Sequence, residues 1–297
     1  MHLFPRLALL GTLLLTTIPL QAQVSFYGTD DFNDNSFAPG RWSSFGTTNG
    51  GLWTETNGRL EFTADATATA ITTANRAQQF RVWSSTTSGN PSYTDSWSAT
   101  MSFTIDKTAV ATNGASVLGF ENFMAGSASG YYGIYLQYAT SGGRIYAEQG
   151  VFNGSGYTRT TLGSTGSLDN TFDGTDVLLQ MNYNASTQAF TSAFSFDAGN
   201  TYYTFGTWTG AGHFGGPATG NTSAWAVTPT TGFGLEVYGA LYGDGVTPGS
   251  TFLSGQAYAD NLTVSAIPEP STYAAFAGLG ALGLAFWRRR QKAAAAA

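Results

Sequence analysis

The stretch Ser96–Ile105, SWSATMSFTI, alternates strictly between apolar side chains and small hydroxyl side chains. Successive side chains of a β-strand point to opposite faces, so this alternation predicts an antiparallel strand with one face in a core and the other facing a polar environment. The residues expected to face the core are Trp97, Ala99, Met101, Phe103 and Ile105.

The same period of two recurs along the chain in four further stretches: Ile134–Tyr138, Val177–Tyr183, Phe190–Phe196 and Phe233–Val237. Turn signals separate such segments, namely Asn57-Gly58, Ser141–Gly143, Asn153-Gly154 and Asp173-Gly174. We find no capped stretch with a 3.6-residue period between these segments. The sequence therefore predicts an all-β fold, a single antiparallel β-sandwich over residues 23–265.

Composition limits the partners of this domain. Residues 24–265 hold seven Lys and Arg against 17 Asp and Glu, a net charge near −10, which disfavours nucleic acid as a partner. The chain has no cysteine, so disulfides, thiolate metal sites and lipoprotein acylation are excluded. The fold must be stabilised by its own core.

The N-terminal stretch Met1–Gln23 has a basic residue, Arg6, an apolar run from Leu7 to Leu20 and a small residue, Ala22. This pattern predicts a signal peptide over residues 1–22, with the Sec translocon and signal peptidase as partners. A transmembrane anchor is the alternative. It is disfavoured because the apolar run is short and a polar segment follows at once.

Near the other terminus, Ile267–Arg290 reads IPEPSTYAAFAGLGALGLAFWRRR. As a helix, the apolar run Tyr273–Trp287 would be about 22 Å long, short for a bilayer core of about 30 Å. The three arginines that follow predict a cytoplasmic end. A tail anchor and a buried terminal helix are alternatives, and the glycines and missing polar face disfavour the latter.

This stretch resembles the PEP-CTERM sorting signal in its Pro-Glu-Pro motif, short apolar helix and Arg cluster. The matching residues are Pro268, Glu269, Pro270, Arg288, Arg289 and Arg290. The resemblance implies a sorting signal over residues 266–292 with a short transmembrane helix, followed by an Ala tail at 293–297. It also implies a protein held transiently in the inner membrane of a Gram-negative bacterium. An exosortase then processes it, and it reaches the cell surface or extracellular matrix.

The domain resembles concanavalin A-like jelly rolls, the lectin and laminarinase superfamily. The opening segment carries Asp31-Phe32-Asn33, Trp42 and Gly58-Arg59-Leu60, Asp176–Asp197 matches a pair of long strands, and Ala257–Ser265 resembles the final strand. The resemblance implies a jelly-roll sandwich and a carbohydrate ligand.

Catalytic residues are not recognisable. Laminarinase-type members carry two glutamates and an aspartate on one strand, as Glu-x-Asp-x-x-Glu, and this string is absent. His213 would be the single histidine after removal of residues 1–22, and no Gly-x-Ser-x-Gly elbow accompanies it. We therefore expect a protein without catalytic activity.

Sugar binding would use aromatic rings that stack on pyranose faces. The candidates are Trp208, His213 and Trp225 in a long Gly/Thr-rich loop, and Trp83 before a second loop. The alternative for each ring is a place in the core.

Asp31 and Asp34, near the first predicted strand, and Asp260, on the last, could together hold a structural Ca²⁺. The alternative is a set of turn and capping aspartates.

Two function classes remain. The first is an exported, non-catalytic envelope or matrix protein that binds extracellular polysaccharide. The second is a divergent glycoside hydrolase or polysaccharide lyase, and the missing Glu-x-Asp-x-x-Glu string favours the first.

Overall fold

The computed structural model describes residues 26–37, 42–64, 76–83, 91, 94–106, 114–124, 130–139, 142–152, 157–168, 172–209, 233–243, 254–267 and 270–295. The chain divides into two units. One is the domain Phe26–Ile267, and the described part of the other is helix α2 (Pro270–Ala295). The predicted signal peptide, residues 1–22, lies outside the described residues.

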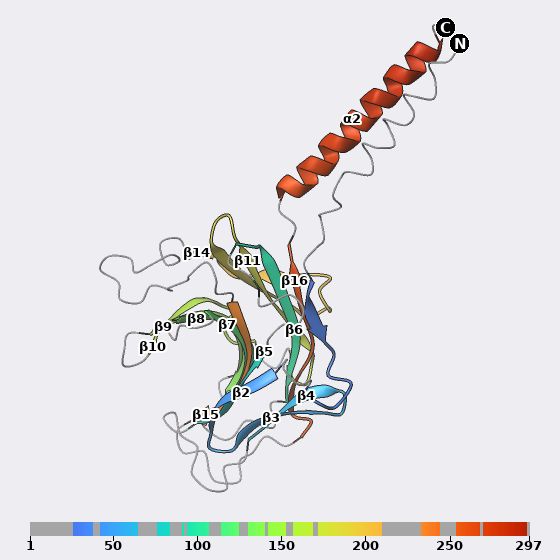
Figure 1. The fold of residues 1–297 in the computed structure, drawn as a ribbon. Coiled ribbons are helices and arrows are strands. Elements are labelled where there is room, and N and C mark those ends of the chain that lie inside the picture. The colour runs from blue at the N-terminus through green and yellow to red at the C-terminus, as the bar shows by residue number, and fades with distance from the viewer. Residues whose placement is uncertain are drawn as a thin grey trace. The chain divides into compact units, whose positions relative to one another are not determined.

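The domain is an antiparallel β-sandwich of two sheets, as the sequence predicts, and Figure 1 shows the sheets face to face. The first sheet has nine strands in the order β13-β12-β11-β6-β16-β4-β3, with β1 paired to β16 and β14 to β12. Its strands are β1 (Phe26–Asp30), β3 (Gly51–Thr56), β4 (Arg59–Ala64), β6 (Trp97–Ile105), β11 (Val177–Asn184), β12 (Ala189–Ser195), β13 (Tyr203–Thr204), β14 (Trp208–Thr209) and β16 (Ala257–Ala266).

The second sheet has seven strands in the order β10-β9-β8-β7-β15-β5-β2. It is strongly curved, and the face that points away from the nine-stranded sheet, here called the outer face, is concave in Figure 1. Its strands are β2 (Trp42–Thr48), β5 (Ala77–Trp83), β7 (Gly114–Met124), β8 (Gly130–Ala139), β9 (Gly142–Phe152), β10 (Tyr157–Ser164) and β15 (Phe233–Gly243).

The alternation that predicted β6 is confirmed. Met101 is fully buried between the sheets while its neighbours Thr100 and Ser102 are half-buried. β6 pairs with β11 on one side and with β16, the last strand of the sandwich, on the other. Pairing along this edge extends one residue beyond β16, because the Ile267 amide donates to the Ser96 carbonyl at 2.7 Å.

Aromatic rings join the two sheets across the core. Phe233 of β15 lies 5.6 Å from the Trp97 ring and 4.8 Å from the Tyr183 ring, both on the nine-stranded sheet. Phe103 of β6 stacks on Phe120 of β7 at 6.1 Å. Rings bury a large apolar area at this spacing, so these contacts supply much of the stability of a chain without disulfides.

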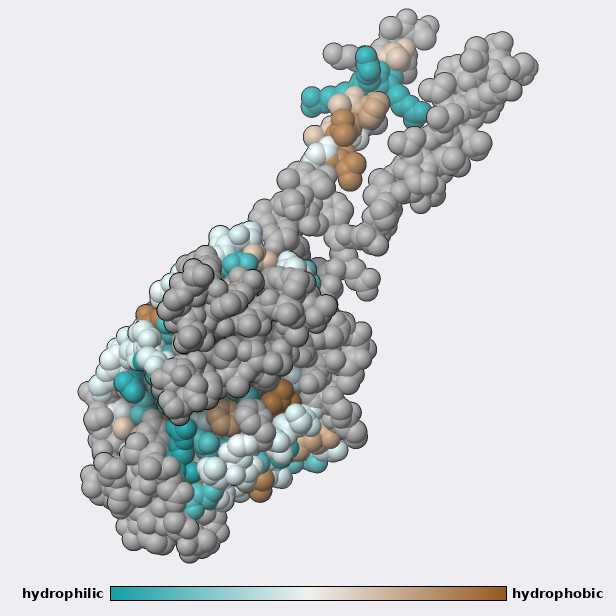
Figure 2. Space-filling view, turned by 60° about the vertical axis from the view of Figure 1, so that its left-hand side comes forward, coloured by the Kyte–Doolittle hydropathy of each residue, from teal (hydrophilic) through white to brown (hydrophobic). Residues whose placement is uncertain are grey.

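Helix α2 confirms the predicted C-terminal helix and is longer than the apolar run, since it continues through the arginines to Ala295. Pro270 is its first residue, a position where the missing amide costs nothing. Leu279, Leu284 and Trp287 are exposed, and Figure 2 shows their apolar stretch in brown beside the teal arginines. Among the helices of the described residues, none has the length and apolarity needed to cross a membrane. Pro268 and Glu269 lie outside the described residues.

Substituting two adjacent residues of β6, one at a time, tests the assignment of the two faces of the strand. Met101→Asp should lower the free energy of unfolding by about 3 kcal/mol or more, because it buries an unpaired carboxylate. Thr100→Asp should cost far less, since its side chain lies on the polar face. Thermal melting of the two variants measures the difference, and equal melting temperatures would contradict the register described here.

Candidate functional site

The pairing register of the seven-stranded sheet brings three glutamates into one row on the outer face. Glu236 of β15 lies opposite Glu121 of β7, which lies opposite Gly133 of β8, which in turn lies opposite Glu148 of β9. Only five glutamates occur in residues 24–265. More than half of them therefore meet in this row, although they are far apart in the sequence.

An aromatic row runs beside the glutamates. Its paired positions, in order across the sheet, are Tyr146, Tyr135, Gly119, Tyr238 and Phe80. Tyr135 stacks on Tyr146 with ring centroids 5.0 Å apart, and Phe80 stacks on Tyr238 at 4.8 Å. Together with Val117, Tyr131 and Ala240 these rings form an apolar cluster separate from the main core.

Glycines let two tyrosines lie flat on this face. A Cβ atom at Gly133 would collide with the Tyr135 hydroxyl, and one at Gly150 would collide with the Tyr131 ring. The flat rings bring their hydroxyls to the carboxylates: Tyr135 donates to Glu121 Oε1 at 2.6 Å, and Tyr131 donates to Glu148 Oε1 at 2.5 Å. Small residues on β8 and β9 thus fix the positions of the polar groups.

Glu121 and Glu236 form a buried carboxyl pair. Their side chains are only 6% and 5% exposed and hydrogen-bond to each other, which requires a proton between them. Burial raises the pKa of Glu121 to about 7. Burial, and then the adjacent Glu121 carboxylate, raise the pKa of Glu236 well above its usual range. The pair therefore holds its shared proton to a higher pH than two separate, solvated glutamates would.

Glu148 has a different environment. It accepts the Tyr131 hydrogen bond, and its Oε1 lies 3.9 Å from Nε of Arg159 on β10. Burial, followed by the charges of Glu121 and Glu148, raises the pKa of the Tyr131 phenol. The phenol accordingly stays a hydrogen-bond donor to Glu148.

The geometry of the pair limits its chemistry. Glycoside hydrolases hold two carboxyl groups roughly 5 to 9.5 Å apart, on either side of the scissile bond. Glu121 and Glu236 are in direct hydrogen-bond contact, so no sugar ring fits between them. This arrangement suits a shared proton and does not suit an acid and a nucleophile on either side of a substrate.

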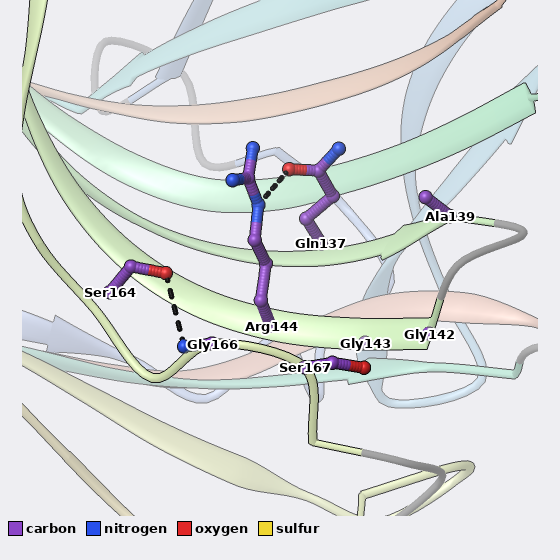
Figure 3. Close-up of a pocket in the computed structure, with 8 residues that line it drawn as sticks. All are labelled: Gln137, Ala139, Gly142, Gly143, Arg144, Ser164, Gly166 and Ser167. Carbon is purple, nitrogen blue, oxygen red and sulfur yellow. Dashed lines mark hydrogen bonds between the residues drawn. The ribbon is translucent and has the colours of Figure 1, made fainter.

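An open pocket of about 360 Å³ adjoins the aromatic row where β8 turns into β9. Arg144 and Gln137 point into it side by side in Figure 3, with Ser164 and Gly166 on the segment beside Arg144. Arg144 Nε donates to Gln137 Oε1 at 2.7 Å, and the guanidinium lies 4.6 Å from the centre of the Tyr146 ring. The lining residues are Gln137, Ala139, Gly142, Gly143, Arg144, Ser164, Gly166 and Ser167.

Of the four predicted glycan-binding residues, Trp83 has a described side chain, and it does not line this pocket. Trp208 begins β14, whose backbone pairs with Phe190 on the nine-stranded sheet, and its side chain is not described. His213 and Trp225 lie outside the described residues. The prediction for Trp83 is wrong, because its ring is only 2% exposed and belongs to the core, where no sugar can stack on it.

The predicted calcium ligands do not form a metal site. Among the described residues no three His, Cys, Asp or Glu side chains are grouped to hold an ion. Asp31 and Asp34 each accept a hydrogen bond from a backbone amide two residues ahead, and Asp260 accepts one from the next amide. These are the turn roles that the alternative interpretation assigned to them.

The three outer-face glutamates were not predicted from the sequence. A signal was present: β7 and β15, GASVLGFENFM and FGLEVYGALYG, each carry a single charged residue among apolar residues that occupy both faces. One charge in a strand with two apolar faces must be buried, and buried charges cluster at functional sites.

Comparison with known proteins adds the sorting signal. The PEP-CTERM protein-sorting motif matches residues 266–290, which agrees with the resemblance noted in the sequence. The motif indicates an exported protein that is transiently anchored in the membrane and sorted to the surface, and it implies processing by an exosortase. No curated protein matches the chain.

Solved structures are similar to the sandwich at low sequence identity. The CBM2 module of the evolved Dit of Lactobacillus casei BL23 phage J-1 is 12% identical, with a TM-score of 0.49, covering 82% of this chain and 96% of that one. An endo-1,3-beta-glucanase from Streptomyces sioyaensis is 14% identical (TM-score 0.47, coverage 84% and 98%). A lectin from Bauhinia forficata is 12% identical (TM-score 0.42, coverage 81% and 98%).

The shared proton makes stability depend on pH. Because both pKa values lie above those of an unfolded chain, the stability that the pair contributes at acidic pH is lost as pH rises through about 7. Glu236→Gln supplies an amide donor to the Glu121 carboxylate and removes the like charge. In the wild type, the free energy of unfolding should decline between pH 5 and 8 by up to about 1.4 kcal/mol per pH unit for one proton. We expect this decline to be shallower in Glu236→Gln.

Glu55→Gln is the matched control. Burial also raises the pKa of Glu55, on β3 of the other sheet, to about 7. Glu55→Gln therefore removes the contribution of Glu55 to the pH dependence of stability and leaves the contribution of the Glu121–Glu236 pair. Urea unfolding at several pH values measures each slope. Parallel curves for the wild type and Glu236→Gln would show that the two carboxyls do not share a proton.

Proposed function

We propose that this is an exosortase-sorted extracellular protein whose sandwich binds polysaccharide without cleaving it, in the pocket beside Arg144. The sorting motif supports export and surface delivery. A Gram-negative host, with transient retention in its inner membrane, is part of the proposal. So is the final location in the envelope or matrix.

The observation that carries the binding proposal is the pocket on the curved sheet. Its lining combines an amide, a guanidinium, two hydroxyls and three glycines, which leave backbone groups accessible. Sugar hydroxyls need such a mixture of donors and acceptors, and the contact with the Tyr146 ring helps to hold the Arg144 guanidinium in place. Its volume is in the range of pockets that take small ligands.

Cleavage of a polysaccharide is the second candidate function. The row of glutamates favours it, because Glu121 and Glu148 lie two strands apart, about 9.6 Å between backbones, on either side of Gly133. Against it, the Tyr135 hydroxyl lies over Gly133 and both carboxyl groups already have hydrogen-bonded partners. Release of reducing ends or unsaturated sugars by the wild type, lost in Glu148→Gln, would favour this candidate.

Filling the pocket should weaken binding. Ser164→Leu places a large apolar side chain among the lining residues and removes a hydroxyl, so retention on immobilised polysaccharide should fall by about tenfold. Thr160→Leu makes the same kind of change at an exposed position of the same strand, outside the pocket lining, and should leave retention unchanged. Affinity electrophoresis on a panel of neutral and acidic polysaccharides measures both variants.

Trp208→Ala and Trp225→Ala test the loop that the sequence analysis proposed. Loss of retention in these variants with none in Ser164→Leu would move the site from the pocket to that loop. Failure of the wild type to bind any polysaccharide on the panel would contradict the proposed function.

Sorting should depend on the Pro-Glu-Pro motif. In a host that expresses its exosortase, the wild type should lose its C-terminal segment, whereas Glu269→Ala should keep it, and mass spectrometry of the exported protein reports the difference. A proline lacks the backbone amide of a helix or strand and favours an extended conformation in the residue before it, which suits an extended substrate. Identical mature masses would rule out recognition of this motif.

A further inference from the structure

We infer that the pocket binds the carboxylate of an acidic sugar through the guanidinium of Arg144. The inference rests on the proposed function and names its ligand class: glycans that contain uronic acid. It starts from the juxtaposition of one positioned guanidinium with an open pocket on the outer face (Figure 3).

The guanidinium is held from two sides before any ligand arrives. Nε is bonded to Gln137, and the cation lies over the Tyr146 ring, which itself stacks on Tyr135. These contacts leave the two terminal nitrogens of Arg144 directed away from Gln137. A planar fork of this kind matches the two oxygens of a carboxylate, and its fixed orientation lowers the entropy cost of binding.

Arg144 has no acidic partner among the described residues. The two ion pairs found there are Arg59 with Glu61 and Arg159 with Glu148. Across the sheet, the positions in the same row as Arg144 are the neutral residues Gln137, Val117, Ala240 and Gln78. The charge of Arg144 is therefore available to an anion that enters the pocket.

A second donor faces the same space. The Ser164 hydroxyl accepts a hydrogen bond from the Gly166 amide at 3.4 Å, which leaves its own hydrogen for a ligand oxygen. Figure 3 shows Ser164 on the segment beside Arg144, and both residues line the pocket. A sugar in the pocket can give its carboxylate to Arg144 and a ring hydroxyl to Ser164.

The net charge of the domain further limits the class of ligand that can bind. With a net charge near −10, residues 24–265 repel a dense polyanion at long range, and salt screens this repulsion beyond about 8 Å at 0.15 M. Recognition must then come from short-range contacts to one acidic unit. Short oligosaccharides at physiological salt are accordingly the appropriate probe.

Calorimetric titration of the mature protein with three matched oligosaccharides tests the inference: one containing glucuronic acid, its neutral glucose counterpart and its sulfated counterpart. We expect the uronic acid form to bind at least about tenfold more tightly than the neutral form. Arg144→Gln should abolish this preference, and Arg144→Lys, which lacks the fork, should restore only part of it. Arg76→Gln makes the same change of charge at a residue outside the pocket lining and should have no effect.

The outcomes distinguish failure of the carboxylate assignment from failure of the proposed function. Equal binding of acidic and neutral forms, unchanged in Arg144→Gln, would overturn the carboxylate assignment and leave polysaccharide binding standing. Preference for the sulfated form would overturn it as well. Absence of binding to all three forms and to the polysaccharide panel would overturn the proposed function itself. Unchanged melting of each variant shows that the fold is intact.

Discussion

The central strands of the seven-stranded sheet are buried on both faces, and the arrangement of the outer face follows from this constraint. Every described residue of β8 from Tyr131 to Tyr138 is buried, whichever face its side chain occupies. A polar group on such a strand can find a partner only within the protein, and leaving it unpaired costs free energy. On the outer face, the hydroxyls of Tyr131 and Tyr135 bond to glutamates, and Glu121 shares a proton with Glu236.

Carboxyl groups at the centre of a sheet are an expensive choice for stability. Removing them in favour of apolar residues would often be neutral or stabilising, so their presence points to selection for something other than stability. The glycines opposite and beside them support the same view. Gly133 and Gly150 give up side-chain packing in the middle of two strands so that Tyr135 and Tyr131 can lie flat on the face.

Strand alternation predicted the sandwich because it is a local property. Met101, Leu179 and Val237 each show their inward direction in their own stretch of sequence, and all three are in the core. The site depends instead on register between strands that are distant in the sequence, as for Glu121 and Glu236, and no local pattern specifies which residues will be opposite one another. The errors have the same origin. Trp83 and Asp260 were assigned from residue type and expected position along the chain, while burial and turn geometry decided their roles.

The last strand has a consequence for the timing of export. β16 lies inside the nine-stranded sheet, with β6 along one side and β4 and β1 along the other. These three strands come earlier in the chain, and their pairing is complete only after β16 has been synthesised and exported. Its pairing reaches Ile267, the residue directly before Pro268. An enzyme that needs several extended residues before its cleavage point would have to draw them from this strand. The residues that complete the sheet, Ala266 and Ile267, thus directly precede the sorting motif. Processing that required these residues in an extended, unpaired form would have to come before the last strand pairs, or would have to open its end.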